Sequence, residues 1–117
     1  MRLLSPQISQ FLKKLNLDQR RNITMVPKSD SAGNPGDIVI FRYIRGLTQR
    51  AAMLVQPIAK DARTGNLLLT VVLIDPNEYE TVEQLRNLYT NRGSLPENSY
   101  RTFIMSRITG PLLRMVI

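Results

Sequence analysis

The segment DIVIFRYI, residues 37–44, is the clearest indication of the fold class, because it is short, apolar at most positions and rich in β-branched and aromatic residues. Such runs are typical of β-strands with both faces buried. Four further segments share this character and are separated by turn-forming residues: residues 50–58, 66–74, 100–108 and 112–117. The sequence therefore predicts five strands.

Two helices are predicted beside these strands. Ser5 and Pro6 supply an N-cap and a first-turn proline ahead of an apolar stripe with helical spacing, which predicts a helix over residues 6–15. Thr81 and Gln84 have the spacing of a capping box in front of a second apolar stripe. One short helix should therefore lie between the third and fourth strands.

Five short apolar strands cannot hide both faces in a small flat sheet, whereas a curled sheet buries most of them and removes exposed edges. We expect a mainly β (α+β) fold, an SH3-like small barrel of five strands with an N-terminal helix over one mouth and one short inserted helix. Residues 1–35 should hold the helix and a loop and residues 36–117 the barrel, within one structural domain. An open α+β sheet with two helices on one side is the alternative.

The residue types that are missing exclude much familiar enzyme chemistry. The 117-residue chain has no cysteine and no histidine, which excludes disulfides, Cys/His metal sites, thiol nucleophiles and imidazole acid–base catalysis. No metal and no cofactor are expected. The N-terminal stretch MRLLSPQISQ has neither the pattern of a signal peptide nor that of a membrane span. We therefore expect a cytoplasmic protein, in the host cytoplasm if the protein is viral, with no membrane partner.

The charge of the chain points to an anionic partner. Lys and Arg total 16 against nine Asp and Glu, a net charge of +7. Twelve of the 16 basic residues are arginines, whose planar guanidinium groups suit bidentate phosphate contacts and base stacking. Nucleic acid is the partner class that this composition favours.

Residues 100–108, YRTFIMSRI, combine such arginines with an aromatic ring. Strict alternation along one strand would place Arg101, Phe103, Met105 and Arg107 on the same face. Two cations beside a ring are the groups that single-stranded nucleic acid uses, for its phosphates and its bases respectively.

The same residues also have a purely structural interpretation. In it, Phe103 belongs to the core, and the arginines sit at the strand ends with their stems over it. Arg107 could equally pair with Asp75 or Asp37 as an internal ion pair.

Other basic residues extend the candidate surface. Arg42 and Tyr43, with Arg45 just after the first strand, form a second cation–aromatic group, and Arg20 and Arg21 are candidate phosphate contacts. The complete set of candidate nucleic-acid-binding residues is Arg20, Arg21, Arg42, Tyr43, Arg45, Arg50, Arg101, Phe103 and Arg107.

Three segments of the first half of the chain have a recognisable pattern: GDIVIF at residues 36–41, RAAMLVQP at 50–57 and RTGNLLL at 63–69. In these segments the chain resembles the MazF/PemK type of toxin endoribonuclease. The resemblance implies a small barrel in which Arg50 corresponds to the arginine that stabilises charge on the scissile phosphate. Ala51 replaces the family's proline, and Leu73 and Ile74 stand in the segment where the family supplies a catalytic threonine.

The second half resembles the last strand of WYL-type ligand-sensing domains, which are Sm/SH3-like barrels. Arg101, Phe103, Arg107 and Ile108 match the Arg-x-Phe-x-x-x-Arg-Ile pattern of that strand, and Leu69 matches the last residue of the Trp-Tyr-Leu signature. This resemblance implies a role in sensing nucleotides or nucleic acid.

The sequence therefore leads us to expect a small, basic, non-enzymatic barrel that binds RNA or DNA. One alternative is a protein–protein accessory, inhibitory or assembly module of a phage-like or mobile element, which could include a homodimer. The other is a MazF-like endoribonuclease, in which Arg50 would be catalytic.

Overall fold

The central strand of the fold is β2 (Ile38–Tyr43), which arises from the segment DIVIFRYI. It pairs with β3 (Arg50–Leu54) on one side and with β7 (Ile108–Met115) on the other. The computed structural model describes residues 4–17, 23–27, 33–44, 46 and 48–117. The first four residues of β2 are all buried, as the near-continuous apolar run predicts.

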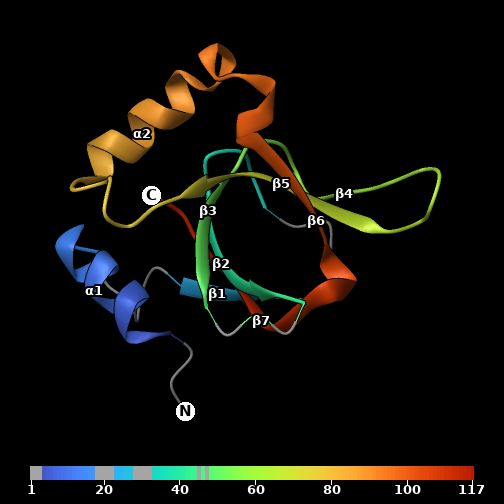
Figure 1. Cartoon of the computed structure of the whole chain (residues 1–117), viewed down its shortest axis with the longest axis horizontal. Helices are drawn as coiled ribbons and strands as arrows, with labels where there is room; N and C mark the ends of the chain where they lie inside the picture. The colour runs from blue at the N-terminus through green and yellow to red at the C-terminus, as the bar shows by residue number, and fades with distance from the viewer. Residues whose placement is uncertain (1–3, 18–22, 28–32, 45, 47) are drawn as a thin grey trace.

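The described part of the chain forms a mainly β domain of seven antiparallel strands and two helices (Figure 1). The other strands are β1 (Ile23–Val26), β4 (Ala59–Lys60), β5 (Leu67–Ile74) and β6 (Tyr100–Ile104). The hydrogen-bonded order is β1-β7-β2-β3-β5-β4, and β6 pairs with β5. Since no pairing joins β6 to β7 among the described residues, the curled sheet is not a closed barrel.

The prediction of five strands was therefore too low. The two additional strands, β1 and β4, are four and two residues long, and each pairs with one longer strand, β7 and β5 respectively. Such short segments carry little periodicity of their own. They become strands because a longer strand offers them an unpaired edge.

The prediction of one strand over residues 100–108 was wrong. Strand β6 ends at Ile104, a single 3-10 turn, η3 (Met105–Arg107), follows, and β7 begins at Ile108. The chain pairs with β5 before this turn and with β2 after it, so it has to change direction between them. Arg101 and Arg107 therefore do not share one strand face.

Residues 109–111, which separate the predicted strands 100–108 and 112–117, do not form a turn between strands but lie inside β7. Gly110 has a φ of 73°, in the left-handed region that glycine adopts without a Cβ penalty. The β2–β7 ladder shifts its register at this level, between Ile40 and Arg42. The glycine therefore serves an irregularity within a long strand rather than its start.

Both helices form as predicted, as α1 (Pro6–Lys14) and α2 (Val82–Thr90). The Ser5 hydroxyl accepts the N–H of Ile8 at 3.3 Å. The Thr81 hydroxyl accepts the N–H of Gln84, and the Gln84 side-chain oxygen accepts the N–H of Thr81, both at 3.2 Å, which is a capping box. Neither of these helices is long and apolar enough to cross a membrane, and the rest of the described chain contains no such helix.

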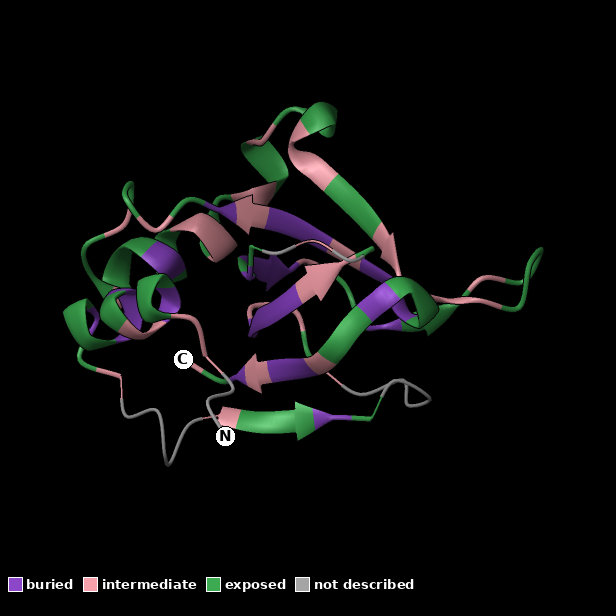
Figure 2. Cartoon of the chain, turned by 60° about the horizontal axis from the view of Figure 1, so that its bottom comes forward, coloured by how far each residue is buried: buried purple, intermediate pink, exposed green. Residues whose placement is uncertain are grey.

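The two faces of the sheet bury two separate hydrophobic clusters (Figure 2). The outer cluster joins Ile38 and Ile40 of β2 to buried residues of α1 and α2. The inner cluster contains Val39 and Phe41 of the same strand and fills the concave side of the curl. Both helices thus cover the outer face, whereas α1 had been expected to cover a mouth of the barrel.

Candidate nucleic-acid interface

Four of the predicted binding residues come together at one end of the inner face of the sheet. Tyr43 follows the buried residues of β2, Arg50 begins β3, and Arg101 and Phe103 belong to β6. Alternation along β2 and β3, and the pairing of β6 with buried residues of β5, place all four on the side of the inner cluster. The curl of the sheet therefore brings together residues from three strands.

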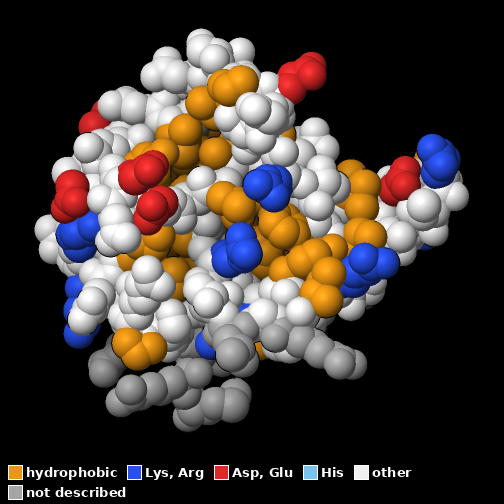
Figure 3. Space-filling model, in the orientation of Figure 1, with side chains coloured by type: hydrophobic (Ala, Val, Ile, Leu, Met, Phe, Trp, Pro, Cys, Tyr) orange, Lys and Arg blue, Asp and Glu red, His pale blue; other side chains and the backbone are white. Residues whose placement is uncertain are grey.

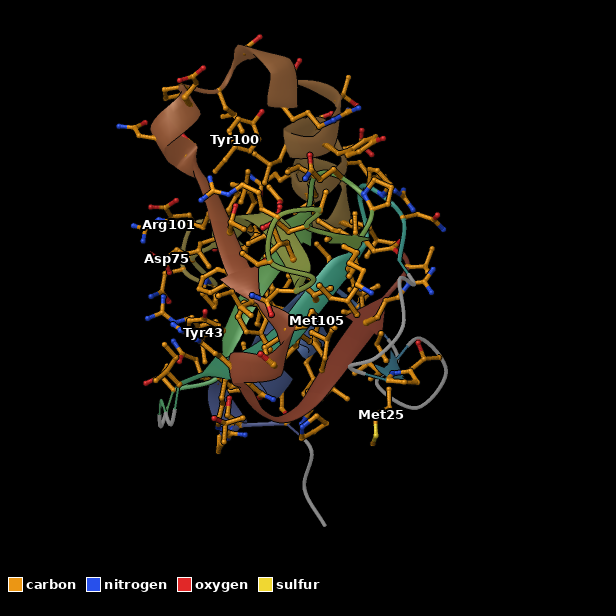
Figure 4. All side chains as sticks on the ribbon, turned by 90° about the vertical axis from the view of Figure 1, so that its right-hand side faces the viewer. Met25, Tyr43, Asp75, Tyr100, Arg101 and Met105 are labelled. Carbon is orange, nitrogen blue, oxygen red and sulfur yellow. The ribbon has the colours of Figure 1, made fainter. Side chains whose placement is uncertain are left out.

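These four residues line one pocket of about 240 Å³, together with Gly46 and Thr48. We call it the aromatic pocket. Figure 4 shows Tyr43 and Arg101 along the same side of the molecule, with Met25 on the opposite side. Guanidinium groups and aromatic rings therefore lie together in this pocket, but they come from three strands, whereas the predicted groups lay along single strands.

The rings of this pocket are held by one another. Phe103 packs edge-on against Phe41, with ring centroids 5.1 Å apart, and against Tyr43 at 4.7 Å. The Tyr43 hydroxyl also accepts the backbone N–H of Ile104 at 3.2 Å. Tyr43 thus connects β2 to the edge of β6 that no strand covers in the described chain. Phe103 fits both the core and the binding interpretation, because it is half-buried against the inner cluster and also lines the pocket.

The two arginines of the pocket, Arg50 and Arg101, are exposed. Within the described residues, no carboxylate lies within 4.0 Å of the Arg50 or Arg101 guanidinium group, since the ion pairs there involve other cations. The face shown in Figure 3 has Lys and Arg side chains among hydrophobic ones in its centre, and the Asp and Glu side chains lie away from that centre. An anion approaching this centre meets positive charge and apolar surface together.

A second pocket, of about 340 Å³, adjoins the first, because Thr48 and Arg50 line both. We call it the acidic pocket, since its lining includes Asp75 and Glu78. Beside it, burial and the neighbouring Glu78 carboxylate raise the pKa of the Tyr79 phenol above its ordinary value. Because Arg50 lines both pockets, it lies between the aromatic pocket and the acidic pocket.

The remaining predicted residues do not join the aromatic pocket. Arg42 alternates to the other side of β2 from Tyr43 and has an interaction of its own. Arg107 is exposed in η3 and is not among the pocket's lining residues. Arg20, Arg21 and Arg45 lie outside the described residues.

The proposed pairing of Arg107 with Asp37 is wrong. Asp37 instead accepts a hydrogen bond from Nε of Arg114 at 2.6 Å. Within the described residues, no ion pair joins Arg107 to Asp75 either.

Gly46, Thr48 and Asp75 are among the residues of this region that sequence reasoning did not assign to the site. Gly46 and Thr48 lie between β2 and β3 and carry no charge or ring that would single them out. Asp75 follows the last residue of β5, and a correct register between β3 and β5 would have placed it opposite Arg50. That register was the missing information.

No family model matches the chain, and no curated protein or solved structure is significantly similar to it. The resemblances to MazF/PemK toxins and to WYL-type domains therefore stay predictions.

We expect Tyr43→Phe to lower the free energy of unfolding by about 1 kcal/mol, because the Ile104 N–H loses its acceptor while the ring contacts remain. Urea denaturation followed by circular dichroism measures this change. Tyr79→Phe is the matched control, since the Tyr79 hydroxyl has no hydrogen bond among the described residues. Equal losses in the two variants would contradict a bridging role for the Tyr43 hydroxyl.

Proposed function

We propose that this protein binds single-stranded RNA or DNA at the aromatic pocket without cleaving it. The observation that carries the proposal is that two aromatic rings line the same pocket as two guanidinium groups, neither of which forms an ion pair with a described carboxylate. Single-strand binding proteins combine these groups, since phosphates contact the cations and bases stack on the rings. The +7 net charge of the chain would assist the approach of a polyanion.

The binding test uses a fluorescein-labelled oligonucleotide of about eight nucleotides, within the usual range for a small binding fold. We expect binding at low salt, and a Kd that rises about sevenfold between about 50 and 200 mM salt if two phosphates are contacted. Fluorescence anisotropy measures the Kd at low salt and its change with salt concentration. RNA and DNA both carry phosphates and bases, so comparing the Kd of an RNA and a DNA version of the oligonucleotide shows which nucleic acid the protein prefers.

A duplex of the same sequence is the control for stacking. It carries more phosphate charge, but its bases are enclosed, so the rings of Tyr43 and Phe103 gain nothing from it. We expect the duplex to bind more weakly than the single strand. Equal or tighter duplex binding would reduce the site to a non-specific polyanion surface, and no binding of any oligonucleotide would overturn the proposal.

We also propose that the curled sheet is an SH3-like barrel that is open along one seam. The support is the pairing path β6-β5-β3-β2-β7, whose two ends are joined by the single turn η3. In this assignment β1 and β4 are additions to the five barrel strands. An experimentally determined structure with β6 and β7 widely separated would contradict it.

A protein-interaction module is the second candidate, and the edge strand β1 favours it. Among the described strands β1 pairs only with β7, and Met25 on it is 59% exposed. Unpaired edges with apolar residues are common docking sites for other chains. Concentration-dependent self-association in analytical ultracentrifugation, without oligonucleotide binding, would favour this candidate.

Ribonuclease activity is the third candidate, because Arg50 is exposed beside Asp75 in the acidic pocket. An arginine can stabilise charge on a phosphate during cleavage. Prolonged incubation with labelled single-stranded RNA, with no metal added, separates binding from cleavage. Products that are lost in Arg50→Ala would replace the binding proposal with an enzymatic one.

A further inference from the structure

The acidic pocket places a carboxylate beside a surface that otherwise suits phosphate. The last bonded pairs between β3 and β5 are Ala51 with Ile74 and Ala52 with Leu73. One further step of this register sets Arg50 opposite Asp75, on the side of the inner cluster. Figure 4 shows Asp75 between Arg101 and Tyr43 along the same side of the molecule.

One internal hydrogen bond orients the Asp75 carboxylate and leaves most of its hydrogen-bonding capacity available. Its Oδ1 accepts the backbone N–H of Asn77 at 2.9 Å. Within the residues that the structure describes, Oδ2 has no hydrogen-bond partner, and Asp75 forms no ion pair with Arg50. An ionised carboxylate can accept about four hydrogen bonds, so most of its capacity faces solvent at the pocket.

A carboxylate at this place repels phosphate, so a nucleic acid seated in the aromatic pocket has to offer it a donor. The donors of a nucleic acid are the N–H groups of its bases and, in RNA, the 2′-hydroxyl. Guanine is the base with two adjacent donors on one edge, N1–H and the 2-amino group, which match the two oxygens of a carboxylate. Uracil offers one N–H between two carbonyl oxygens, which the carboxylate repels.

We propose that Asp75 selects guanine among the bases of the bound single strand. This inference rests on the proposed function, because Arg50, Arg101 and the rings would hold the strand. Asp75 then reads the edge of a base that reaches over Arg50 into the acidic pocket. It is a specificity-determining residue, and strands without guanine bind without a favourable contact to it.

The test uses three labelled RNA octamers that differ at one central position: uridine throughout, one guanosine, or one inosine, which lacks the 2-amino group. We expect the guanosine oligomer to bind about tenfold more tightly than the uridine oligomer, as for a bidentate side chain–base contact. The inosine oligomer should lie between them. DNA versions report whether the 2′-hydroxyl is the donor instead.

Asp75→Asn should remove the preference for guanosine over inosine and uridine, because the amide replaces one acceptor with a donor. The Kd for the uridine oligomer should be unchanged or lower, since the repulsion of phosphate is gone. Glu97→Gln is the matched control, because it removes one exposed carboxylate outside both pockets and should keep the preference.

The outcomes separate this inference from the proposed function. Salt-dependent binding of all three oligomers with equal Kd would overturn the selection of guanine and leave single-strand binding intact. An RNA preference that depends on Asp75, without a guanine preference, would also overturn it, because the donor would then be the 2′-hydroxyl. Failure to bind any oligomer would overturn the function on which it rests. The wild-type comparison of guanosine with inosine gives an answer even if the variant does not fold.

Discussion

Replacing Arg50 and Arg101 together with alanine should weaken binding of a single-stranded oligonucleotide about a hundredfold at low salt. Each guanidinium group is expected to make one charge-assisted contact to phosphate, worth about 1.4 kcal/mol or a factor of ten. Neither is neutralised by an internal carboxylate in the described part of the molecule. The loss of each phosphate contact should therefore weaken binding directly.

The salt dependence gives a second readout of the same change. Each phosphate contact on a single strand contributes about 0.7 to the slope of log K against log salt, so the double variant should lower that slope by about 1.4. Fluorescence anisotropy over a salt series measures it. A loss of affinity with an unchanged slope would mean that the arginines shape the pocket without contacting phosphate.

A control variant separates position from net charge. Arg86→Ala together with Arg63→Ala removes the same charge from α2 and from the turn before β5, outside the aromatic pocket. These substitutions should leave the Kd within about threefold, because only long-range attraction is reduced. If both double variants weaken binding equally, then the convergence of Arg50 and Arg101 has no special role.

Asp37→Ala should lower the free energy of unfolding by about 3 kcal/mol. Asp37 is only 4% exposed, and its Oδ2 accepts hydrogen bonds from Arg114 Nε at 2.6 Å and from the N–H of Asn34 at 2.8 Å. Removing one member of a buried ion pair costs about 3–5 kcal/mol because the other charge stays buried without a partner. We expect a value at the lower end of this range because the Arg114 side chain is 24% exposed and can still contact water.

This loss corresponds to a Tm decrease of about 10 °C for a domain of this size, and urea denaturation gives the free energy directly. Asp37→Asn should cost less, because the amide oxygen can still accept the Asn34 N–H. Glu80→Gln is the exposed counterpart, since its ion pair with Lys14 at 3.4 Å is largely solvated and worth at most about 1 kcal/mol. A similar loss in Glu80→Gln and Asp37→Ala would contradict the assigned role of the buried pair.

Predictions from local sequence patterns are confirmed where the interactions are themselves local. The capping box of Thr81 and Gln84 and the N-cap of Ser5 lie within a few residues of their backbone partners, and both form as expected. The apolar run of β2 is likewise explained by its own composition, because it is buried on both faces. These features need no knowledge of the rest of the chain.

The wrong predictions concern segments whose structure depends on pairing with a distant part of the chain. Residues 23–26 form β1 through pairing with residues 112–115, and the strand predicted over residues 100–108 is broken because the chain passes from β5 to β2. The pairing of Asp37 with Arg114 follows from the β2–β7 contact, 77 positions apart in the chain. No local pattern encodes these choices.

The amino-acid sequence alone determined that this is a basic chain of short apolar strands and two capped helices, with arginine and aromatic residues at particular strand positions, because alternation, capping and composition act over a few residues. Only the tertiary structure decided which of these side chains share a pocket. The curl of the sheet brings Tyr43, Arg50 and Arg101 together and sends Arg42 and Arg107 elsewhere. The physical reason is that strand register and sheet curvature depend on the packing of both faces at once.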